Sequence, residues 1–513
     1  MHGFKLLALS SSVPLLASAQ CPDYLDYSTQ IHEPLSSGKY KLPYQRPSEE
    51  CRTFKSQSLE DTITRMESVI KDPDLYRLFT NAYPNTLDTA VKWKGYAADN
   101  ADEELTFLIT GDINAMWLRD SSNQMQSYLP LLNASSDPNS IASLYRGVIN
   151  LQARYILTSP YCNSFQPPIE SNIGIANNTS ASQDTVYPTY NNQSVFECKY
   201  ELDSLAAFLE ISSNYYSATG DLAFFGKFKW VQTVEAILKV AADMMTPTYG
   251  DDGAVLESPY SFTRLTTRAT ETLANDGLGN PTANGTGLIR SAFRPSDDST
   301  IFQLFIPANM MLSTYLSSTA EIMSKLNSSN SASLATQMTG LSKSLQEAIE
   351  SHGTTTHSTF GKIYAYEVDG FGGTTIMDDA NIPSLLSAPF LGYPVDQETY
   401  DNTRALILSA SNPYFMRGPV INAVGGPHQG PGMAWPMASI VRILTTDDDD
   451  EIKGQLREIL GSTDGLGLIH ESVNSFNASR WTRQWFSWAN GLFGQMVLDL
   501  ETRKPGILDT SFQ

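Results

Sequence analysis

The chain has 513 residues, of which 41% are hydrophobic and 17% charged, and its formal net charge is −21. This acidic balance excludes a nucleic-acid partner, because an acidic surface and a phosphate backbone repel each other. The apolar content is that of a globular chain with a large core and excludes intrinsic disorder.

Residues 1–19 have the pattern of a removable signal peptide. Lys5 gives the start of the chain a positive charge, an interrupted apolar stretch runs from Leu6 to Leu16, and the small residues Ala17-Ser18-Ala19 follow at the cleavage spacing. The apolar stretch is too short to cross a bilayer, and no later segment approaches about 18 consecutive apolar residues. The sequence therefore predicts a secreted protein that does not bind a membrane.

The cysteines and glycosylation motifs are also typical of a secreted protein. The four cysteines contain no CxxC pair and indicate disulfides, for which three pairings are possible. We favour Cys21 with Cys51 and Cys162 with Cys198, because these are neighbours in the sequence. Seven Asn-X-Ser/Thr acceptors predict a glycoprotein, at Asn133, Asn177, Asn178, Asn192, Asn284, Asn327 and Asn477.

Beyond an N-terminal extension at 20–57, we expect residues 58–513 to form one closed array of helices. Helical periodicity covers 58–71, 141–151, 200–218, 234–245, 299–325, 334–349, 435–445, 451–460 and 482–500. Strand-like alternation is limited to 105–110 and 361–368. The acidic run 447–450 favours the start of a helix. The long segments 161–196, 246–297, 352–400 and 412–434 are loops of a length that is commonly functional.

The first cluster of reactive side chains is Thr110 to Asp120, which holds Asp112, Trp117, Arg119 and Asp120. One interpretation is a helix start, with Asp120 or Ser121 as the cap and Arg119 in a salt bridge. The other is a sugar site, because pyranose rings stack on aromatic faces while carboxylates and guanidinium groups pair with vicinal hydroxyls.

The second cluster is Phe293 to Ser299, with Arg294, Asp297 and Asp298. It is predicted to open the helix that runs through Ile306, where acidic residues favour the helix dipole. Two adjacent carboxyl groups beside an arginine are equally a means of keeping one acid protonated and the other ionised.

Three further clusters lie in the second half of the chain. The segment 377–383 contains Asp378, Asp379 and Asn381 without the alternation of a calcium loop, so hydrogen bonds to sugar hydroxyls or to the loop's own backbone are expected. A loop rich in Gly and Pro, 425–436, presents His428 and Trp435. The last cluster, 470–490, contains His470, Glu471 and Trp488, the last within a tryptophan-rich run.

Several enzyme classes are excluded by spacing. The chain has no HExxH motif, its six histidines form no zinc-ligand grouping, and it has no Gly-X-Ser-X-Gly elbow. We therefore expect neither a metal nor a cofactor.

Taken together, the five clusters resemble glycoside hydrolase family 125, the exo-α-1,6-mannosidases. The segments that carry the resemblance are TGDINAMWLRDS, FRPSDDS, YEVDGFGG with MDDANIPSLLS, GGPHQGPGMAW, and HESVN with RWTRQWFSWANGLFG. The resemblance spans about residues 60 to 500. It implies an all-α fold, an (α/α)6 barrel, and hydrolysis of terminal α-1,6-linked mannose with inversion. The implied substrate is a mannose-containing oligosaccharide or glycoprotein glycan, and we expect a monomer.

The resemblance also implies residue roles. Glu471 matches the general base, and the general acid is Asp297 or Asp298, of which we favour Asp297. The residues expected to bind the sugar are Asp112, Trp117, Arg119, Asp120, Arg294, Asp379, His428, Trp435, His470 and Trp488. Val473-Asn474 stands where the family would have an aromatic residue after the HES segment. The alternatives are an exo-glycosidase with another linkage preference on the same barrel and a glycan-binding protein without catalysis.

Overall fold

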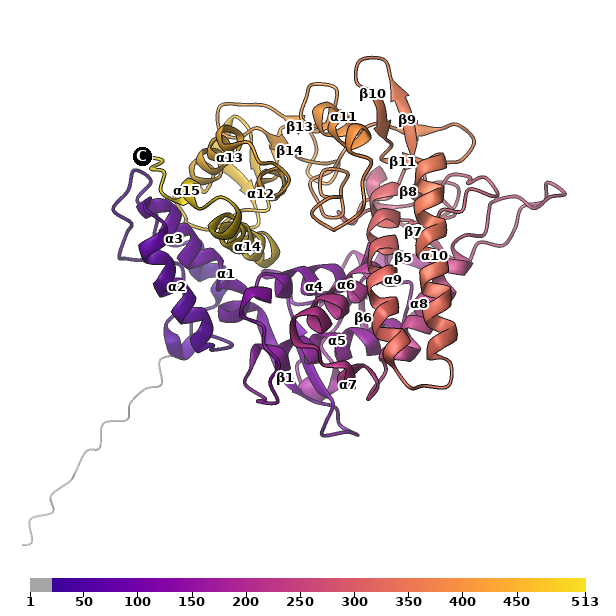
Figure 1. Cartoon of the computed structure of the whole chain (residues 1–513), viewed down its shortest axis with the longest axis horizontal. Helices are drawn as coiled ribbons and strands as arrows, with labels where there is room; N and C mark the ends of the chain where they lie inside the picture. The colour runs from indigo at the N-terminus through magenta and orange to yellow at the C-terminus, as the bar shows by residue number, and fades with distance from the viewer. Residues whose placement is uncertain (1–20) are drawn as a thin grey trace, which may run out of the picture.

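The computed structural model describes residues 21–513, so the predicted signal peptide lies outside the described residues. Helices dominate the fold and alternate between an inner and an outer position along the chain (Figure 1). The inner helices are α4 (Leu118–Gln126), α6 (Leu202–Thr219), α9 (Ile306–Lys325), α12 (Pro436–Leu444) and α14 (Ser487–Arg503). All of them are buried over most of their length, because neighbours cover them on every side.

Contacts between the inner helices run from α12 to α14, from α14 to α4, from α4 to α6 and from α6 to α9. A largely buried, turn-rich segment, 384–392, lies between α10 and α11, and its Gly392 lies against Thr314 of α9. Asp378 fixes the start of this segment by accepting the backbone N–H groups of Leu385 and Leu386.

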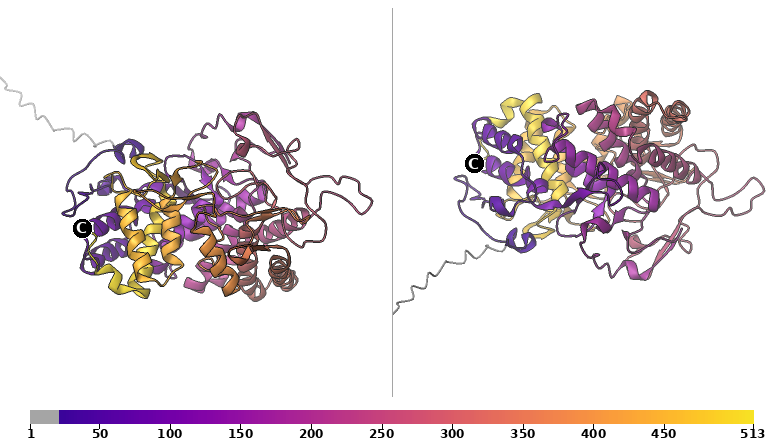
Figure 2. Two further views of the ribbon diagram at one scale, coloured as in Figure 1. Left: turned by 90° about the horizontal axis from the view of Figure 1, so that it is seen from above. Right: turned by 90° about the horizontal axis from the view of Figure 1, so that it is seen from below.

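The outer helices follow their inner partners, and all except α5, which β2 covers, expose a polar face. They are α5 (Ile141–Thr158), α8 (Trp230–Asp243), α10 (Ser331–His352), α11 (Gln397–Ile407) and α13 (Asp449–Gly461). The N-terminal α2 (Gln57–Val69) and α3 (Pro73–Ala82) close the ring, since α3 packs on both α13 and α14. Figure 2 shows the C-terminal helices side by side. This alternation is an (α/α)6 barrel, so the predicted all-α fold is confirmed.

Short antiparallel strands decorate the loops. They are β1 (Val91–Tyr96), β2 (Glu104–Leu108), β3 (Met116–Trp117), β4 (Ser164–Phe165), β5 (Asp184–Tyr187), β6 (Val195–Glu197), β7 (Ser261–Arg264), β8 (Leu304–Phe305), β9 (Thr354–His357), β10 (Gly361–Tyr364), β11 (Glu367–Val368), β12 (Thr374–Thr375), β13 (Phe415–Met416), β14 (Ala423–Val424), β15 (Met433–Ala434), β16 (Ser472–Asn474) and β17 (Asn477–Thr482). Within the described chain they form small sheets ordered β1-β2, β3-β4-β6, β12-β11-β8, β5-β7, β10-β9, β13-β14 and β15-β16-β17.

Several of these strands end immediately before an inner helix. β3 leads into α4, β8 into α9 and β15 into α12, while β6 precedes α6 and β17 precedes α14 by a few residues. Four of the five clusters found in the sequence occupy these approaches to inner helices, and the segment 377–383 leads into the turn-rich segment 384–392. The barrel therefore gathers segments that are far apart in the sequence at the start of its inner helices.

Two local expectations were wrong. The helix predicted from residue 299 begins only at Ile306, because 293–300 form a turn in which Arg294 N–H donates to Asp298 O (2.8 Å) and Asp297 adopts φ +62°. The Thr110 cluster does contain a helix start, at Leu118, and Arg119 is in a salt bridge, but Trp117 stands in the capping position, so neither Asp120 nor Ser121 is the cap. The acidic run does begin α13, where the Asp448 side chain accepts from Asp450 and Glu451 N–H.

The N-terminal segment 21–56, with α1 (Tyr24–Tyr27), packs beneath the β17–α14 connection. The Tyr24 ring meets the edge of Trp485, and Gln484 Nε2 donates to Ser28 O (3.0 Å). Both disulfides, Cys21–Cys51 and Cys162–Cys198, are confirmed. The remaining short helices are α7 (Leu222–Phe225) and α15 (Pro505–Leu508). No helix among residues 21–513 combines the length and apolarity needed to cross a membrane.

Candidate active site

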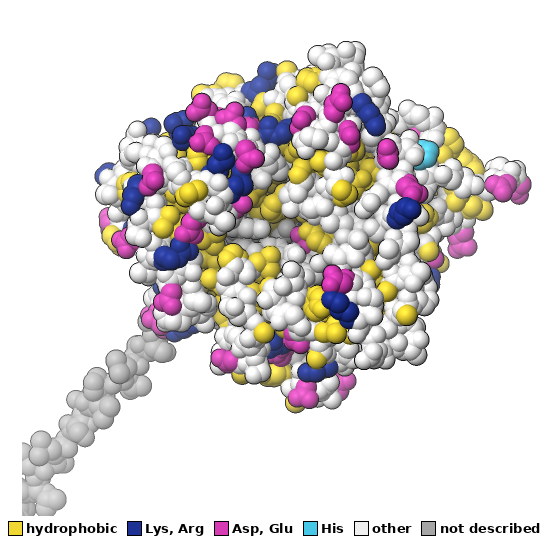
Figure 3. All heavy atoms as spheres, viewed as in Figure 1, with side chains coloured by type: hydrophobic (Ala, Val, Ile, Leu, Met, Phe, Trp, Pro, Cys, Tyr) yellow, Lys and Arg dark blue, Asp and Glu magenta, His cyan; other side chains and the backbone are white. Residues whose placement is uncertain are grey.

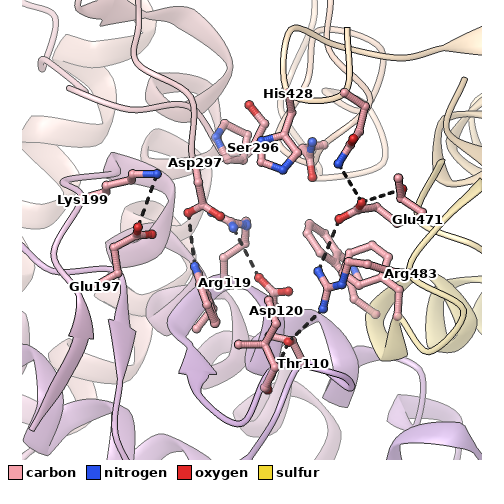
Figure 4. A pocket seen from close by; sticks show the side chains of 18 of the residues that line it. Thr110, Arg119, Asp120, Glu197, Lys199, Ser296, Asp297, His428, Glu471 and Arg483 are labelled. Carbon is pink, nitrogen blue, oxygen red and sulfur yellow. Dashed lines mark hydrogen bonds and ion pairs between the residues drawn. The ribbon is translucent and has the colours of Figure 1, made fainter. Parts of the chain in front are cut away.

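A cavity of about 430 Å³ opens where the approaches to the inner helices converge (Figure 4). This volume falls within the usual range of small-ligand sites. Eight of the residues predicted for the site line it, namely Trp117, Arg119, Asp120, Asp297, His428, Trp435, Glu471 and Trp488. Elsewhere, on the molecular face in Figure 3, acidic and basic side chains are interspersed.

Glu471 occupies one wall of the cavity, at the start of β16. Its Oε2 accepts hydrogen bonds from Thr482 Oγ1 (2.8 Å) and Gln429 Nε2 (3.1 Å). Its Oε1 faces Arg483 Nη1 at 3.4 Å. These three donors hold the carboxyl group in one orientation, which a general base requires.

Arg483 connects Glu471 to the Thr110 cluster. Its Nε donates to Asp112 Oδ1 (2.7 Å) and its Nη2 donates to Thr110 Oγ1 (3.0 Å). Gly111 permits this approach, because it adopts φ +126° and a Cβ there would lie 2.2 Å from Trp485 O. Asp112 therefore contacts Arg483 and does not line the cavity.

Asp297 occupies the opposite wall (Figure 4). Its Oδ1 accepts from Asn163 Nδ2 (2.8 Å) and Trp117 Nε1 (3.2 Å). Burial alone would raise the pKa of Asp297, but the positive charges of Arg119 and Lys199 outweigh burial and lower the pKa below its usual value. Its left-handed backbone turns this side chain into the cavity, away from that of its neighbour.

Asp298 lies outside the cavity wall and is fully buried. Its Oδ2 accepts from Ser296 Oγ (3.1 Å), and its Oδ1 lies 3.6 Å from His428 Nδ1. Burial disfavours the charged form of His428, but Asp298 and nearby carboxylates outweigh burial and raise the pKa of His428 to about 9. The two adjacent carboxyl groups therefore have different surroundings, and Asp297 is the one that reaches the cavity.

Arg119 and Asp120 line one side of the cavity, here called the floor. Arg119 Nη1 donates to Glu201 Oε2 (2.6 Å) and Asp203 Oδ2 (3.2 Å), and its Nη2 lies 3.3 Å from Asp120 Oδ2. Burial raises the pKa of Asp120 above its ordinary value and that of Asp203 to about 6, even against the attraction of Arg119. The Arg119 guanidinium also lies 5.9 Å from the centre of the Trp488 ring.

Unpartnered polar atoms mark the part of the cavity suited to a sugar. Trp435 Nε1, Trp488 Nε1, Asp120 Oδ2 and Arg119 Nε are buried and have no hydrogen-bond partner among residues 21–513. Buried polar atoms normally have partners, so these donors and acceptors call for a polyhydroxylated ligand. The indole rings beside them offer the apolar surface on which a pyranose ring packs.

Three predicted sugar-binding residues lie behind the cavity wall. Arg294 is buried in an ion pair with Glu367 (2.7 Å), and Asp379 accepts from the Asn381 side chain (3.0 Å), which itself lines the cavity. His470 stacks on Trp481 with ring centres 4.5 Å apart, and burial lowers its pKa to about 4. These residues support the wall and do not reach the ligand space.

The residues that sequence reasoning missed are Asn163, Lys199, Glu201, Asp203, Gln429 and Arg483. Lys199, Glu201 and Asp203 stand together in the KYELD segment before α6, where two acids close to a helix start look like ordinary capping. Asn163 lies in a long loop, and the sequence does not indicate that this loop brings it to Asp297. Arg483 and Gln429 belong to recognised segments and were overlooked within them.

Comparison with known proteins assigns the family. The model of the metal-independent α-mannosidases, glycoside hydrolase family 125, matches residues 72–498. The chain belongs to this family. It is an α-mannosidase by that membership. No group of three or more His, Cys, Asp or Glu side chains suited to a metal ion is present in residues 21–513.

Two relatives extend the comparison. The meiotically up-regulated gene 157 protein of Schizosaccharomyces pombe is 46% identical over 491 residues, which cover 95% of this chain and 94% of that protein. A metal-independent α-mannosidase of Streptococcus pneumoniae, solved in a non-productive complex with α-1,6-mannobiose, is 34% identical with a TM-score of 0.76. The match covers 89% of this chain and 99% of the bacterial chain.

Proposed function

We propose that this α-mannosidase removes terminal α-1,6-linked mannose with inversion, using Glu471 as general base and Asp297 as general acid. The observation that carries this proposal is the pair of carboxyl groups on opposite walls of one sugar-sized cavity (Figure 4). Inverting glycosidases need such a pair about 6.5 to 9.5 Å apart, so that a water molecule fits between the base and the sugar.

The reaction follows from the two environments. Glu471, held by Thr482, Gln429 and Arg483, removes a proton from water as that water attacks the anomeric carbon. Asp297 gives a proton to the glycosidic oxygen, which leaves with the remainder of the glycan. The attacking water and the departing oxygen are on opposite faces of the ring, so the anomeric configuration inverts.

Binding of the terminal mannose is assigned to the cavity floor. Asp120 and Arg119 accept from and donate to vicinal hydroxyl groups, while the Trp435 and Trp488 indoles donate through their unpartnered N–H groups. Lys199 and Asn178 also line the cavity, and we assign the leaving sugar to their side of it.

The natural substrate in this proposal is a mannose-containing oligosaccharide or glycoprotein glycan met outside the cell. Support comes from the two disulfides and the signal-like residues 1–19, which fit a secreted protein. The bacterial relative solved with α-1,6-mannobiose supports the linkage.

The test is the release of mannose from matched disaccharides. Purified protein is incubated with α-1,6-, α-1,2- and α-1,3-mannobiose, with Glu471→Gln protein as the control for contaminating activity. We expect at least tenfold faster release from the α-1,6 isomer. Preference for another isomer would establish a glycosidase of different linkage preference, and binding without release from any isomer would establish a glycan-binding protein.

A further inference from the structure

The N-terminal segment 21–56 lies outside the part of the chain that the family model matches, which is 72–498. It is nevertheless fastened to the barrel. A disulfide closes the segment into a loop, and Arg46 is buried in an ion pair with Asp88 (2.7 Å). A charge pair buried in this way is costly to break, because either partner alone would be left without compensation. The segment is therefore a fixed part of the fold.

This segment contacts two consecutive residues of the connection between β17 and α14. The Gln484 side chain is buried and donates to Ser28 O (3.0 Å). The Tyr24 ring packs edge-on against the buried indole of Trp485, with ring centres 5.0 Å apart. The N-terminal segment therefore covers Gln484 and Trp485 with one hydrogen bond and one aromatic contact.

The residue immediately before this pair, Arg483, has an unusual backbone conformation. Its φ of +45° lies in the left-handed region, which a residue other than glycine keeps only where the surrounding structure holds it. The Glu471 backbone N–H donates to Arg483 O (3.2 Å), so the carbonyl group of Arg483 is held by the residue proposed as base. The residues that follow Arg483 are held by the N-terminal segment.

Trp485 also contacts a second partner of Arg483. Its backbone carbonyl accepts from the Asp112 N–H (3.3 Å), and its Nε1 donates to Thr89 Oγ1 (3.0 Å). The Asp112 side chain in turn accepts from Arg483 Nε (2.7 Å). A shift of Trp485 would therefore disturb both the backbone that carries Arg483 and the carboxylate that orients its guanidinium group.

We propose that Tyr24 and Ser28 are positioning residues for the proposed general base. By holding the two residues that follow Arg483, they aim its guanidinium group at Glu471. This inference rests on the proposed role of Glu471. Neither positioning residue lines the cavity, so their loss should disturb the orientation of the base and leave the contacts to the terminal sugar in place. The expected signature is a lower kcat with little change in KM.

The experiment is a double-mutant cycle between Tyr24→Leu and Arg483→Gln, assayed with α-1,6-mannobiose. Tyr27→Leu is the matched control, because Tyr27 is a half-buried tyrosine of the same short helix whose ring stacks on His32 and not on Trp485. We expect Tyr24→Leu to lower kcat about tenfold with less than about twofold change in KM, and Tyr27→Leu to leave both within about twofold of wild type. Tyr24→Phe, which keeps the ring, should restore kcat to within about threefold of wild type.

The cycle shows whether Tyr24 acts through Arg483. In Arg483→Gln protein, Tyr24→Leu should lower kcat by less than about twofold, because the group that it positions is gone. Equal fold losses in both backgrounds would overturn the inference, as would a kcat of Tyr24→Leu within about twofold of wild type or a rise in KM in place of the fall in kcat. If Arg483→Gln is too slow to assay, Asp112→Asn supplies the second background under the same criteria.

Two further measurements keep the inference separate from folding and from the assignment of the base. If Tyr24→Leu does not fold, Gln484→Met, which removes the donor to Ser28 O, takes its place in the cycle with the same expected outcomes. The base is tested by Glu471→Gln: a loss below about tenfold would overturn that assignment. Independent losses in the cycle, beside a loss of about a thousandfold in Glu471→Gln, would overturn the positioning role alone.

Discussion

The substitution Glu471→Gln replaces the proposed general base by its amide and tests the role of Glu471 most sharply. The Oε2 position accepts from Thr482 and Gln429, while the Oε1 position faces a guanidinium donor at 3.4 Å. A glutamine can keep its oxygen on the first side only by turning its NH2 group toward Arg483. The opposite orientation sets that NH2 group against the Gln429 amide nitrogen. In either orientation two hydrogen-bond donors face each other, so we expect the free energy of unfolding of the variant to fall by about 1 to 3 kcal/mol.

The effect on rate should be larger than this loss of stability. Amide substitution removes proton acceptance from water, and general base assistance contributes about 10² to 10⁴ in rate, or about 3 to 5 kcal/mol of activation free energy. We expect a kcat on α-1,6-mannobiose reduced about a thousandfold, measured by mannose release, in protein that remains folded by circular dichroism.

A matched control separates catalysis from folding. Glu458→Gln changes a carboxylate that accepts from the Asn422 backbone (2.8 Å) and side chain (2.9 Å), outside the cavity. We expect Glu458→Gln to lower the free energy of unfolding with little change in kcat. An activity of Glu471→Gln within tenfold of wild type would refute the assignment of the base.

Three other outcomes follow from the site. Activity should survive excess EDTA, because two carboxyl groups suffice for inversion; loss on chelation that is restored by calcium would contradict this. Gly111→Ala should lower the free energy of unfolding by about 3 kcal/mol or more in urea titrations, since its Cβ would meet Trp485 O at 2.2 Å; a loss below about 1 kcal/mol would show that the turn can relax. The folded-state pKa of His428, raised to about 9, makes its charge stabilising below about pH 6.5 and ineffective above pH 9. The stability difference between wild type and His428→Gln, about 1 to 3 kcal/mol, should therefore shrink across that interval, and a constant difference would refute the ion pair with Asp298.

The sequence predicted most of the helices because helix periodicity is local, whereas the barrel was implied by the resemblance to the family. The buried stripes of α5, α8 and α10 are visible at a spacing of three and four residues, and neighbouring cysteines were correctly paired. The start of α9 was misplaced because acidic residues before a helix resemble a cap, whereas Asp297 stands in a left-handed turn.

The composition of the site was harder to predict than the fold. Glu471 and Asp297 stand in distinctive segments, but Asn163, which donates to Asp297, is 134 residues away from it and carries no local signal. Conversely, Arg294 looked like a cavity residue because it neighbours the Asp pair. Arg294 is instead buried in an ion pair with Glu367, which depends on the pairing of β11 with β8, and that pairing has no signal in the sequence.

The stereochemistry of the product tests the central claim most directly. Wild-type protein is mixed with α-1,6-mannobiose in an NMR tube, and the anomeric signals of the released mannose are followed before mutarotation equilibrates them. Attack by a water molecule held by Glu471, opposite an oxygen protonated by Asp297, predicts that β-mannose appears first. Initial release of α-mannose would contradict the account, because it would require a covalent intermediate or attack from the same face.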